Sequence, residues 1–413
     1  MAVADLDIGV GPTLAARSQE RVCSWVLLGI LCLFTLTTFD GGPIGSRVVS
    51  ALLLFAAAFY FLIPPGPLKF RLTVPAVCLL GMSAWGVLQT LYFPSKIVSD
   101  GWAGTLFWFT AAMIALVASS VFHRADVAEK FRLAFVYFAS FICVVDLLEQ
   151  ASHANKYFWV FASRYNVVFG TFSYWNNFAQ FVELALPITL WQGLSRERPD
   201  IRYLLLSALQ ICAVVASGSR AGSVLVLFEL IVVVALAYMR HPNRNFLLGA
   251  AAAVVLTITF VYAAGFSAVI SKLQESDQLA VRRNINRSSL TMLAEHPITG
   301  WGLDTYVPVY RMFALYDDGT YVNRAHNDWL QFAVEGGLPF AALMAVIFIW
   351  SIGPAVSSIW GVGVVAIGIH ALVDYPFARL GVCAWYFALV SMLAYQKAVM
   401  PAEREALMRE SNF

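Results

Sequence analysis

The residues best suited to chemistry lie in one polar segment, residues 266–337, which interrupts nearly continuous apolar sequence. Its strongest candidate for an acid or a base is His326, which lies where the segment returns to apolar sequence. Histidine ordinarily titrates near neutral pH, so it can remove a proton from a hydroxyl group under physiological conditions. A lone histidine is more often structural, but this position favours a chemical role. His296 is a weaker candidate, because a His-Pro pair that ends a helix explains it.

Arginines near this histidine suggest a phosphate-bearing substrate. Arg282, Arg283 and Arg287 are spaced so that two of them can share a helix face. Their guanidinium groups match pairs of phosphate oxygens, although a solvated helix face is an equally simple reading. Arg220 stands at the edge of an apolar stretch among small residues, and Ser219 with nearby backbone amides can add an anion-binding helix N-terminus. We therefore expect these arginines to bind phosphate.

Other polar residues can support this site. The supporting candidates are Ser219, Arg324, Asn327, Asp328 and Asp374. Asp374 can orient His326, pair with an arginine or cap a helix. Glu183 and Glu229 lie inside apolar stretches, where a carboxyl group is either functional or paired to hold helices together. The sequence contains no metal-ligand cluster, P-loop or hydrolase serine motif, and all six cysteines lie in apolar stretches, so we expect no metal, cofactor or disulfide framework.

The composition is that of a membrane protein. The chain is 60% hydrophobic and 13% charged, with a mean hydropathy of +0.72, whereas soluble domains carry about 25% charged residues. A helix that crosses the hydrocarbon core needs about 20 mostly apolar residues. By this rule the expected spans are 22–39, 46–63, 72–92, 103–122, 132–149, 176–193, 202–217, 221–239, 245–265, 338–352, 355–372 and 379–396, with a tight turn at Gly353-Pro354. The predicted fold class is an all-α integral membrane protein with about 12 transmembrane helices.

The distribution of Lys and Arg predicts the orientation of these spans. With the N-terminus in the cytoplasm, fifteen of the 27 basic residues fall on the cytoplasmic side: Arg17, Arg21, Lys69, Arg71, Arg124, Lys130, Arg132, Arg196, Arg198, Arg202, Arg240, Arg244, Lys397, Arg404 and Arg409. Both termini are then cytoplasmic, and Arg220, the large loop and the turn 373–378 all face the periplasm. The basic residues are scattered between spans, so no nucleic-acid partner is expected.

This orientation gives a simple division of the chain. Residues 1–265 hold the first nine spans, 266–337 form the large periplasmic loop, 338–398 hold the last three spans, and 399–413 form a cytoplasmic tail. Within the loop, the spacing of apolar residues predicts a helix over 284–295 and a second helix over 327–335 that continues towards the tenth span. Residues 297–302, which include two glycines, are expected to form a turn between them.

These motifs resemble the O-antigen ligase and polymerase superfamily of bacterial membrane glycan transferases. The blocks that carry the resemblance are Ser217-Gly-Ser-Arg-Ala-Gly222, His296-Pro-Ile-Thr-Gly-Trp-Gly302, and Ala325-His-Asn-Asp-Trp-Leu-Gln331 continuing to Glu335-Gly-Gly337. Weaker matches are Gly170-Thr-Phe with Asn177-Phe-Ala179, and His370-Ala-Leu-Val-Asp-Tyr-Pro376. Members often have Asn-His where this chain has Asn176-Asn177, so no histidine role carries over to that place. Together the blocks cover residues 170–380.

The resemblance implies a metal-independent glycosyltransferase in the bacterial inner membrane. Its donor would be a glycan on undecaprenyl diphosphate, and its acceptor a hydroxyl of a glycan, of lipid A-core or of a protein. By position, His326 matches the essential histidine of the family, Arg220 its membrane-edge arginine, and Arg282 or Arg283 its second arginine. The resemblance implies a role in lipopolysaccharide or exopolysaccharide biosynthesis.

Several readings of the function stay open. An O-antigen ligase, a polysaccharide polymerase and a protein O-oligosaccharyltransferase share this donor and differ in acceptor; ligase or polymerase is favoured because no added soluble domain offers a docking surface for a protein. A secondary transporter is a different class of function, in which Glu183 and Glu229 would be the coupling carboxylates. A large arginine-rich loop disfavours it.

Overall fold

The computed structural model describes residues 14–38, 71–93, 97–163, 167–195, 198–240, 242, 244–263, 278–315 and 321–394. Across these residues the chain is almost entirely helical, with one short antiparallel hairpin of β1 (Lys156–Tyr157) and β2 (Phe161–Ala162). The helices are α1 (Leu14–Leu36), α3 (Val74–Tyr92), α4 (Val98–Val121), α5 (Ala125–Ala151), α6 (Trp175–Leu194), α7 (Ile201–Ser217), α8 (Arg220–Arg240), α9 (Arg244–Ala263), α11 (Gln278–Glu295), α12 (Tyr306–Phe313), α13 (Asp328–Ser358), α14 (Val362–His370), the short 3-10 helix η1 (Pro376–Ala378) and a last helix Leu380–Ala394.

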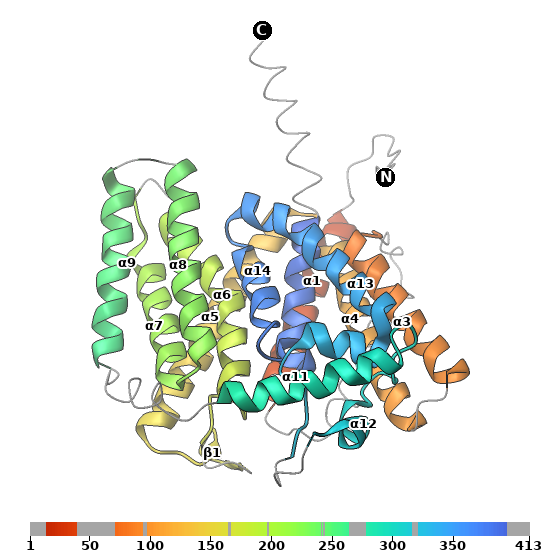
Figure 1. The fold of residues 1–413 in the computed structure, drawn as a ribbon. Coiled ribbons are helices and arrows are strands. Elements are labelled where there is room, and N and C mark those ends of the chain that lie inside the picture. Colours follow the sequence, from red (N-terminus) through yellow and green to blue (C-terminus); the bar gives the residue numbers. More distant parts are fainter. Residues whose placement is uncertain are drawn as a thin grey trace.

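The predicted all-α membrane architecture agrees with these helices. Five of those described, namely α3, α4, α5, α8 and α13, are long and apolar enough to cross a bilayer, and Ile201–Ser217, Asn245–Phe260 and Leu380–Ala394 are shorter apolar helices. They stand side by side, while α11 lies crosswise below their lower ends with α12 and the hairpin beside it (Figure 1). The predicted span 46–63 and the predicted tail 399–413 lie outside the described residues.

The turn predicted at Gly353-Pro354 is wrong, because α13 continues through it to Ser358. Proline lacks the N–H that would bond the carbonyl four residues earlier, but apolar membrane helices tolerate it. The hydroxyl groups of Ser357 and Ser358 both donate to the Pro354 carbonyl, in the last turn of this helix. The chain turns instead at residues 359–361. There Gly361 has no room for a side chain, since a Cβ would lie 2.9 Å from Ala355 Cα.

A second break divides α13 at Gly337, where the backbone is non-helical with φ of 74° and ψ of 174°. This region is essentially restricted to glycine. A Cβ on Gly337 would collide with the carbonyl of Ile298. The predicted helix 327–335 is thus a separate first part of α13, set at an angle to the membrane-spanning part by one glycine.

The predicted turn 297–302 is confirmed, and it packs onto this break. Leu338 N–H donates to the Pro297 carbonyl at 2.8 Å, while Trp301 N–H donates to the Val334 carbonyl at 3.0 Å. From α3, the Gln89 side chain donates to the Glu335 carbonyl at 2.7 Å. Breaking a helix leaves backbone groups without intrahelical partners, and these contacts satisfy them. The turn therefore fixes the direction of the helix that follows His326.

Residues of the polar segment build a small core of their own. The predicted helix 284–295 is present within the longer α11, and its Ile285 and Met292 are buried. They pack with buried residues of α12, of the first part of α13 and of the segment just before it, namely Tyr306, Val309, Tyr310, Val334 and Ala325. The segment is thus a packed cap on one end of the helix bundle, and it can hold side chains in fixed positions.

Candidate functional site

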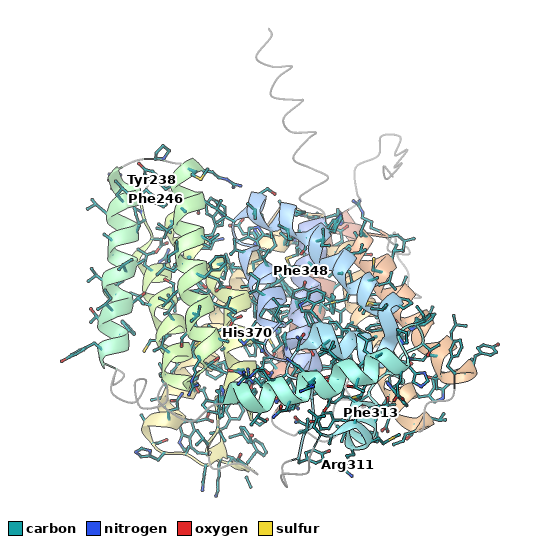
Figure 2. The ribbon with its side chains drawn as sticks, in the orientation of Figure 1. Tyr238, Phe246, Arg311, Phe313, Phe348 and His370 are labelled. Carbon is teal, nitrogen blue, oxygen red and sulfur yellow. The ribbon has the colours of Figure 1, made fainter. Side chains whose placement is uncertain are left out.

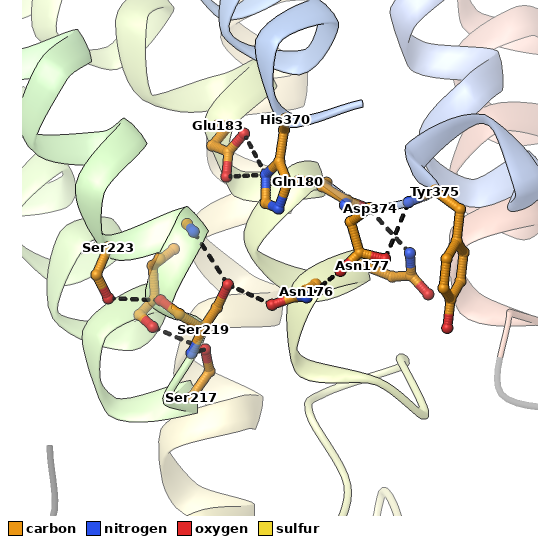
Figure 3. A network of polar contacts seen from close by, with 12 residues as sticks. Asn176, Asn177, Gln180, Glu183, Ser217, Ser219, Ser223, His370, Asp374 and Tyr375 are labelled. Carbon is orange, nitrogen blue, oxygen red and sulfur yellow. Dashed lines mark hydrogen bonds and ion pairs between the residues drawn. The ribbon is translucent and has the colours of Figure 1, made fainter. Parts of the chain in front are cut away.

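Four chain segments meet at one buried carboxylate, Asp374, in the turn that follows α14. The N-terminus of α6, α11, and the start of α13 with His326 two residues before it contact Asp374 directly, and the N-terminus of α8 joins them through Asn176. Figure 3 shows a row of contacts from Ser217 and Ser219 through Asn176 to Asp374. The polar segment, the turn after α7 and the turn after α14, which were predicted to share one face, therefore converge.

Asp374 is fully buried and heavily hydrogen-bonded. Its Oδ2 accepts from the Asn176 amide and from the Tyr174 hydroxyl at 3.4 Å, and its Oδ1 accepts from Tyr375 N–H at 2.9 Å. Burial opposes its ionisation, but the contact with His326 and the charges around it outweigh burial and lower its pKa. Asp374 is therefore a carboxylate at neutral pH. Two of the contacts expected of Asp374 from the sequence are present together: it faces His326 and it lies beside an arginine, Arg282.

His326 stands beside this carboxylate, with Nδ1 at 3.5 Å from Asp374 Oδ1. Its ring packs edge-on against Tyr375, with the ring centres 4.9 Å apart, and its side chain keeps 21% exposure. Its backbone is in the left-handed region with φ of 51°, which costs a residue with a side chain about 1–2 kcal/mol. With Nδ1 facing Asp374, the other ring nitrogen, Nε2, is the one left for a reacting group.

Arg282, the first of the three arginines of α11, is bound to this cluster. Its Nη1 donates to the Val373 carbonyl at 2.7 Å, and its Nη2 lies 3.4 Å from the Tyr174 hydroxyl and 3.7 Å from Asp374 Oδ2. A guanidinium has five N–H donors, so this arginine keeps further donors for a ligand. Arg283 and Arg287 are exposed on other faces of the same helix.

Arg220 lies at the edge of the same cluster as the first residue of α8, and it is half-buried. The preceding Ser219 caps this helix, because its hydroxyl oxygen accepts from Gly222 N–H at 3.1 Å and its hydroxyl donates to Asn176 Oδ1 at 2.6 Å. Gly222 has no room for a side chain, since a Cβ would lie 2.5 Å from Ala179 Cβ. Close packing of α8 on α6 therefore fixes the position of Arg220.

The remaining supporting candidates hold the backbone around His326. Asn327 caps α13 by accepting from Leu330 N–H at 3.1 Å. Asp328 joins α13 to the turn after α14: its backbone N–H donates to the Ala371 carbonyl at 2.9 Å and its carboxyl accepts from Phe377 N–H at 2.8 Å. Arg324 points away from the cluster, towards Asp304 at 3.4 Å.

Sequence reasoning missed three residues of the cluster: Asn176, Tyr174 and Tyr375. Asn176 joins α6 to the start of α8, since it accepts from the Ser219 hydroxyl, and its amide also donates to the Tyr174 hydroxyl at 3.1 Å. The Tyr174 and Tyr375 rings stack with 5.6 Å between centres. Burial and the Asp374 carboxylate raise the pKa of Tyr174, so its phenol stays protonated and can donate. The weaker motif matches at Asn177 and Pro376 were the available signal.

Two other candidates from the sequence have different surroundings. His296 lies away from the cluster, exposed and edge-on against Trp301 at 4.2 Å between ring centres. Glu183 and His370 form a fully buried hydrogen-bonded pair, with 2.8 Å between Oε1 of Glu183 and Nδ1 of His370. Glu229, on α8, is also fully buried.

This arrangement suits proton removal beside an anion. A carboxylate behind a partly exposed imidazole orients the ring and stabilises its protonated form, while Arg282 offers guanidinium donors next to it. Among the described residues, no three His, Cys, Asp or Glu side chains are grouped so as to hold a metal ion.

A comparison with protein families gives one match. Residues 205–345, about a third of the chain, match the family model described as O-antigen ligase. No curated protein matches the chain. The matched region contains Arg220, Arg282 and His326, whereas Asn176 and Asp374 lie outside it. The match confirms the resemblance to the O-antigen ligase superfamily that the motif blocks indicated.

Proposed function

Because residues 205–345 place this chain in the O-antigen ligase superfamily, we propose that it is a membrane glycosyltransferase. It moves a glycan from undecaprenyl diphosphate to an acceptor hydroxyl at the periplasmic face of the inner membrane. The observation that supports this most is the meeting of His326, Asp374 and Arg282 at the end of the helix bundle. An imidazole backed by a buried carboxylate can take a proton, and a guanidinium beside it can hold a diphosphate.

In the proposed reaction His326 is the base. The acceptor O–H gives its proton to Nε2 of His326, and the acceptor oxygen forms a bond to the anomeric carbon of the donor sugar. The bond between that carbon and the diphosphate oxygen breaks, and the lipid diphosphate leaves with the bonding electrons. Asp374, 3.5 Å from Nδ1, stabilises the imidazolium that forms.

The arginines stabilise the leaving group. Negative charge grows on the diphosphate as its bond to the sugar breaks, and fixed donors at that place lower the barrier. Arg282 is the loop arginine that we assign to this role, because its guanidinium contacts both the Val373 carbonyl and the Asp374 carboxylate. Arg220, beside the capping Ser219 at the start of α8, is the second.

We further propose about twelve spans with both termini in the cytoplasm. The periplasmic assignment of the cluster rests on the distribution of basic residues. On the side opposite the cluster, α5 begins with an ion pair between Arg124 and Asp126 at 3.0 Å, and Glu20 of α1 lies 3.6 Å from Arg124.

The acceptor separates the functions within this class. Mass analysis of lipid-linked and surface glycans in cells lacking the protein tests the proposal. Accumulated single repeat units indicate a polymerase, and accumulated long lipid-linked chains indicate a ligase. A specific loss of glycosylated protein indicates a protein O-oligosaccharyltransferase. Unchanged glycans would contradict the proposal and favour a secondary transporter.

A further inference from the structure

A polar row inside the bundle leads away from the site along α6. Asn176, Gln180 and Glu183 are spaced by four and three residues, so they lie on one helix face. All three are at most 3% exposed. The last of them contacts His370, at the end of α14, through both carboxylate oxygens at 2.8 and 3.1 Å. Figure 3 shows the contact between Glu183 and His370, with Glu183 and Asn176 both on α6. Figure 2 places His370 inside the bundle.

Stability alone does not explain this pair, because buried charged pairs in apolar surroundings often add little net stability. Ionisable groups within membrane helices are costly and commonly serve function. The charged groups facing His370 are Glu183 on α6, Asp374 in its own turn and Arg282 on α11. Beyond Glu183 lies Glu229 on α8, within electrostatic range of it.

The same histidine controls the backbone that presents Asp374. The His370 carbonyl accepts from the N–H groups of both Val373 and Asp374 at 3.0 Å. Val373 in turn accepts from Arg282. The segment 370–374 is therefore attached to α6 at two places, by the His370 side chain to Glu183 and by Asp374 to Asn176.

Close packing makes this attachment sensitive to position. At Gly363 a Cβ would collide with the Glu183 carbonyl and would lie 3.1 Å from Leu184 Cα, so the two helix backbones are in contact there. α14 therefore touches α6 at Gly363, and about two helical turns further on His370 contacts Glu183. These two contacts fix the position of α14 along the axis of α6. That position sets where Asp374 lies beside His326.

We propose that His370, clamped by Glu183, is a positioning residue for transfer: it fixes the height of the turn 371–375 on α6 and so the place of Asp374 beside His326. This inference rests on the proposed function, since the reaction whose rate it affects is the proposed glycan transfer. His370 itself does not touch the substrate in this account.

The test compares His370→Leu with His370→Asn in the purified full chain in lipid nanodiscs. An Asn amide nitrogen can occupy the place of Nδ1 and donate to Glu183, whereas Leu cannot. A displacement of about 1 Å at a reacting group can cost about 100-fold, so we expect kcat of His370→Leu to fall about 10- to 100-fold, with KM for a lipid-diphosphate-linked glycan unchanged. His370→Asn should recover much of kcat. His296→Leu, at an exposed histidine away from the cluster, is the matched control and should keep the wild-type rate.

A second readout measures position without catalysis. Val373 is 44% exposed and adjoins Asp374, so Val373→Cys reports the turn through its rate of reaction with a water-soluble thiol reagent. We expect His370→Leu to raise this rate several-fold and His370→Asn to restore it, after subtraction of the protein without the added cysteine. A wild type without transfer activity would contradict the proposed function. The thiol reaction would still test whether the contact between His370 and Glu183 fixes the turn 371–375.

Three results would overturn the inference. One is a folded His370→Leu with unchanged kcat and thiol reactivity. Another is a His370→Asn no better than His370→Leu in both readouts. The third is a loss of activity that follows loss of folded protein, measured by size-exclusion chromatography, because that pattern indicates a structural pair only.

Discussion

At the scale of single residues, the site depends on how a buried carboxylate is kept charged. Asp374 is surrounded by donors from Asn176, Tyr174 and the backbone N–H of Tyr375, and it lies beside the Arg282 guanidinium and the His326 ring. Water is excluded, so each of these contacts counts for more than it would at a surface. The donors hold the carboxylate in one orientation behind the imidazole.

Arg282 should be the most sensitive of the arginines on α11. Lysine keeps the charge but lacks the planar fork that bonds the Val373 carbonyl while facing a phosphate. We expect Arg282→Lys to lose nearly as much transfer activity as Arg282→Ala, and Arg287→Ala, at an exposed position, to keep most of it. Transfer rates of the three purified variants check this order. A fully active Arg282→Lys would instead indicate a simple electrostatic anchor.

Asn176 was not recognised as a site residue, and it offers a sharp test. Replacing it by Leu removes the amide donor from the buried Asp374 carboxylate and the acceptor of the Ser219 hydroxyl. Leaving such groups unpaired costs about 1–3 kcal/mol, so we expect lower thermal stability in detergent together with loss of transfer. Asn177→Leu is the control, because Asn177 is a buried asparagine outside the Asp374 cluster. Its amide donates to the Gln180 side chain on the same helix at 2.9 Å. Equal losses of activity in both variants would contradict a special role for Asn176.

The lowered pKa of Asp374 predicts an acid-sensitive stability. Burial opposes the charge, but His326 and the neighbouring charges lower the pKa below that of the unfolded chain. The stabilisation is therefore present above the ordinary Asp pKa of about 3.9, and it is lost as pH falls through the folded-state value. The melting temperature of the wild type should be higher than that of Asp374→Asn at neutral pH, and the difference between the two melting temperatures should become smaller below about pH 4. A difference that widens on acidification would show the opposite sign.

At the scale of elements, glycines determine how α13 presents His326. The sequence predicted both parts of this helix, but its glycines could not show which one breaks it. Gly353 has open space around it and a helical backbone, so the helix runs on, whereas Gly337 has φ of 74° and contacts the turn 297–302. The difference arises from packing between distant segments, which spacing along one chain does not reveal.

These two glycines give a matched pair of variants. Gly337→Ala forces a Cβ onto the Ile298 carbonyl and into a glycine-only backbone region, a strain of at least about 1–3 kcal/mol. Gly353→Ala should be neutral or stabilising, since alanine favours helix over glycine by about 1 kcal/mol. We expect a clear drop in melting temperature and activity for Gly337→Ala alone. Similar melting temperatures for both variants would show that the break is not needed.

At the scale of the whole molecule, hydropathy predicted most of what the structure contains. Apolar stretches marked the helices, because a bilayer solvates helical backbone only when its hydrogen bonds are satisfied internally. The gathering of Arg220, the polar segment and Asp374 on one face followed from the alternation of spans. The Glu183–His370 pair could not be predicted, since a carboxyl in an apolar helix has many possible partners until the helices are packed.

The proposed topology has its own test. Single cysteines at Val373 and at Tyr321, which are 44% and 68% exposed on the side of the cluster, should react with an impermeant thiol reagent in spheroplasts. A cysteine at Arg198, between α6 and α7 on the opposite side, should react only after the membrane is opened. Labelling of Arg198→Cys in intact spheroplasts would contradict the predicted orientation of the spans.

The most direct measurement of the central claim is transfer by purified His326→Ala. Wild type and variant in nanodiscs receive the same lipid-diphosphate-linked glycan and a hydroxyl acceptor, and product is measured by mass spectrometry. A positioned base contributes about 100- to 10,000-fold, so the account predicts a loss of that size with unchanged folding and donor binding. His296→Ala should keep most of its activity. A folded His326→Ala that transfers glycan at nearly the wild-type rate would contradict the account.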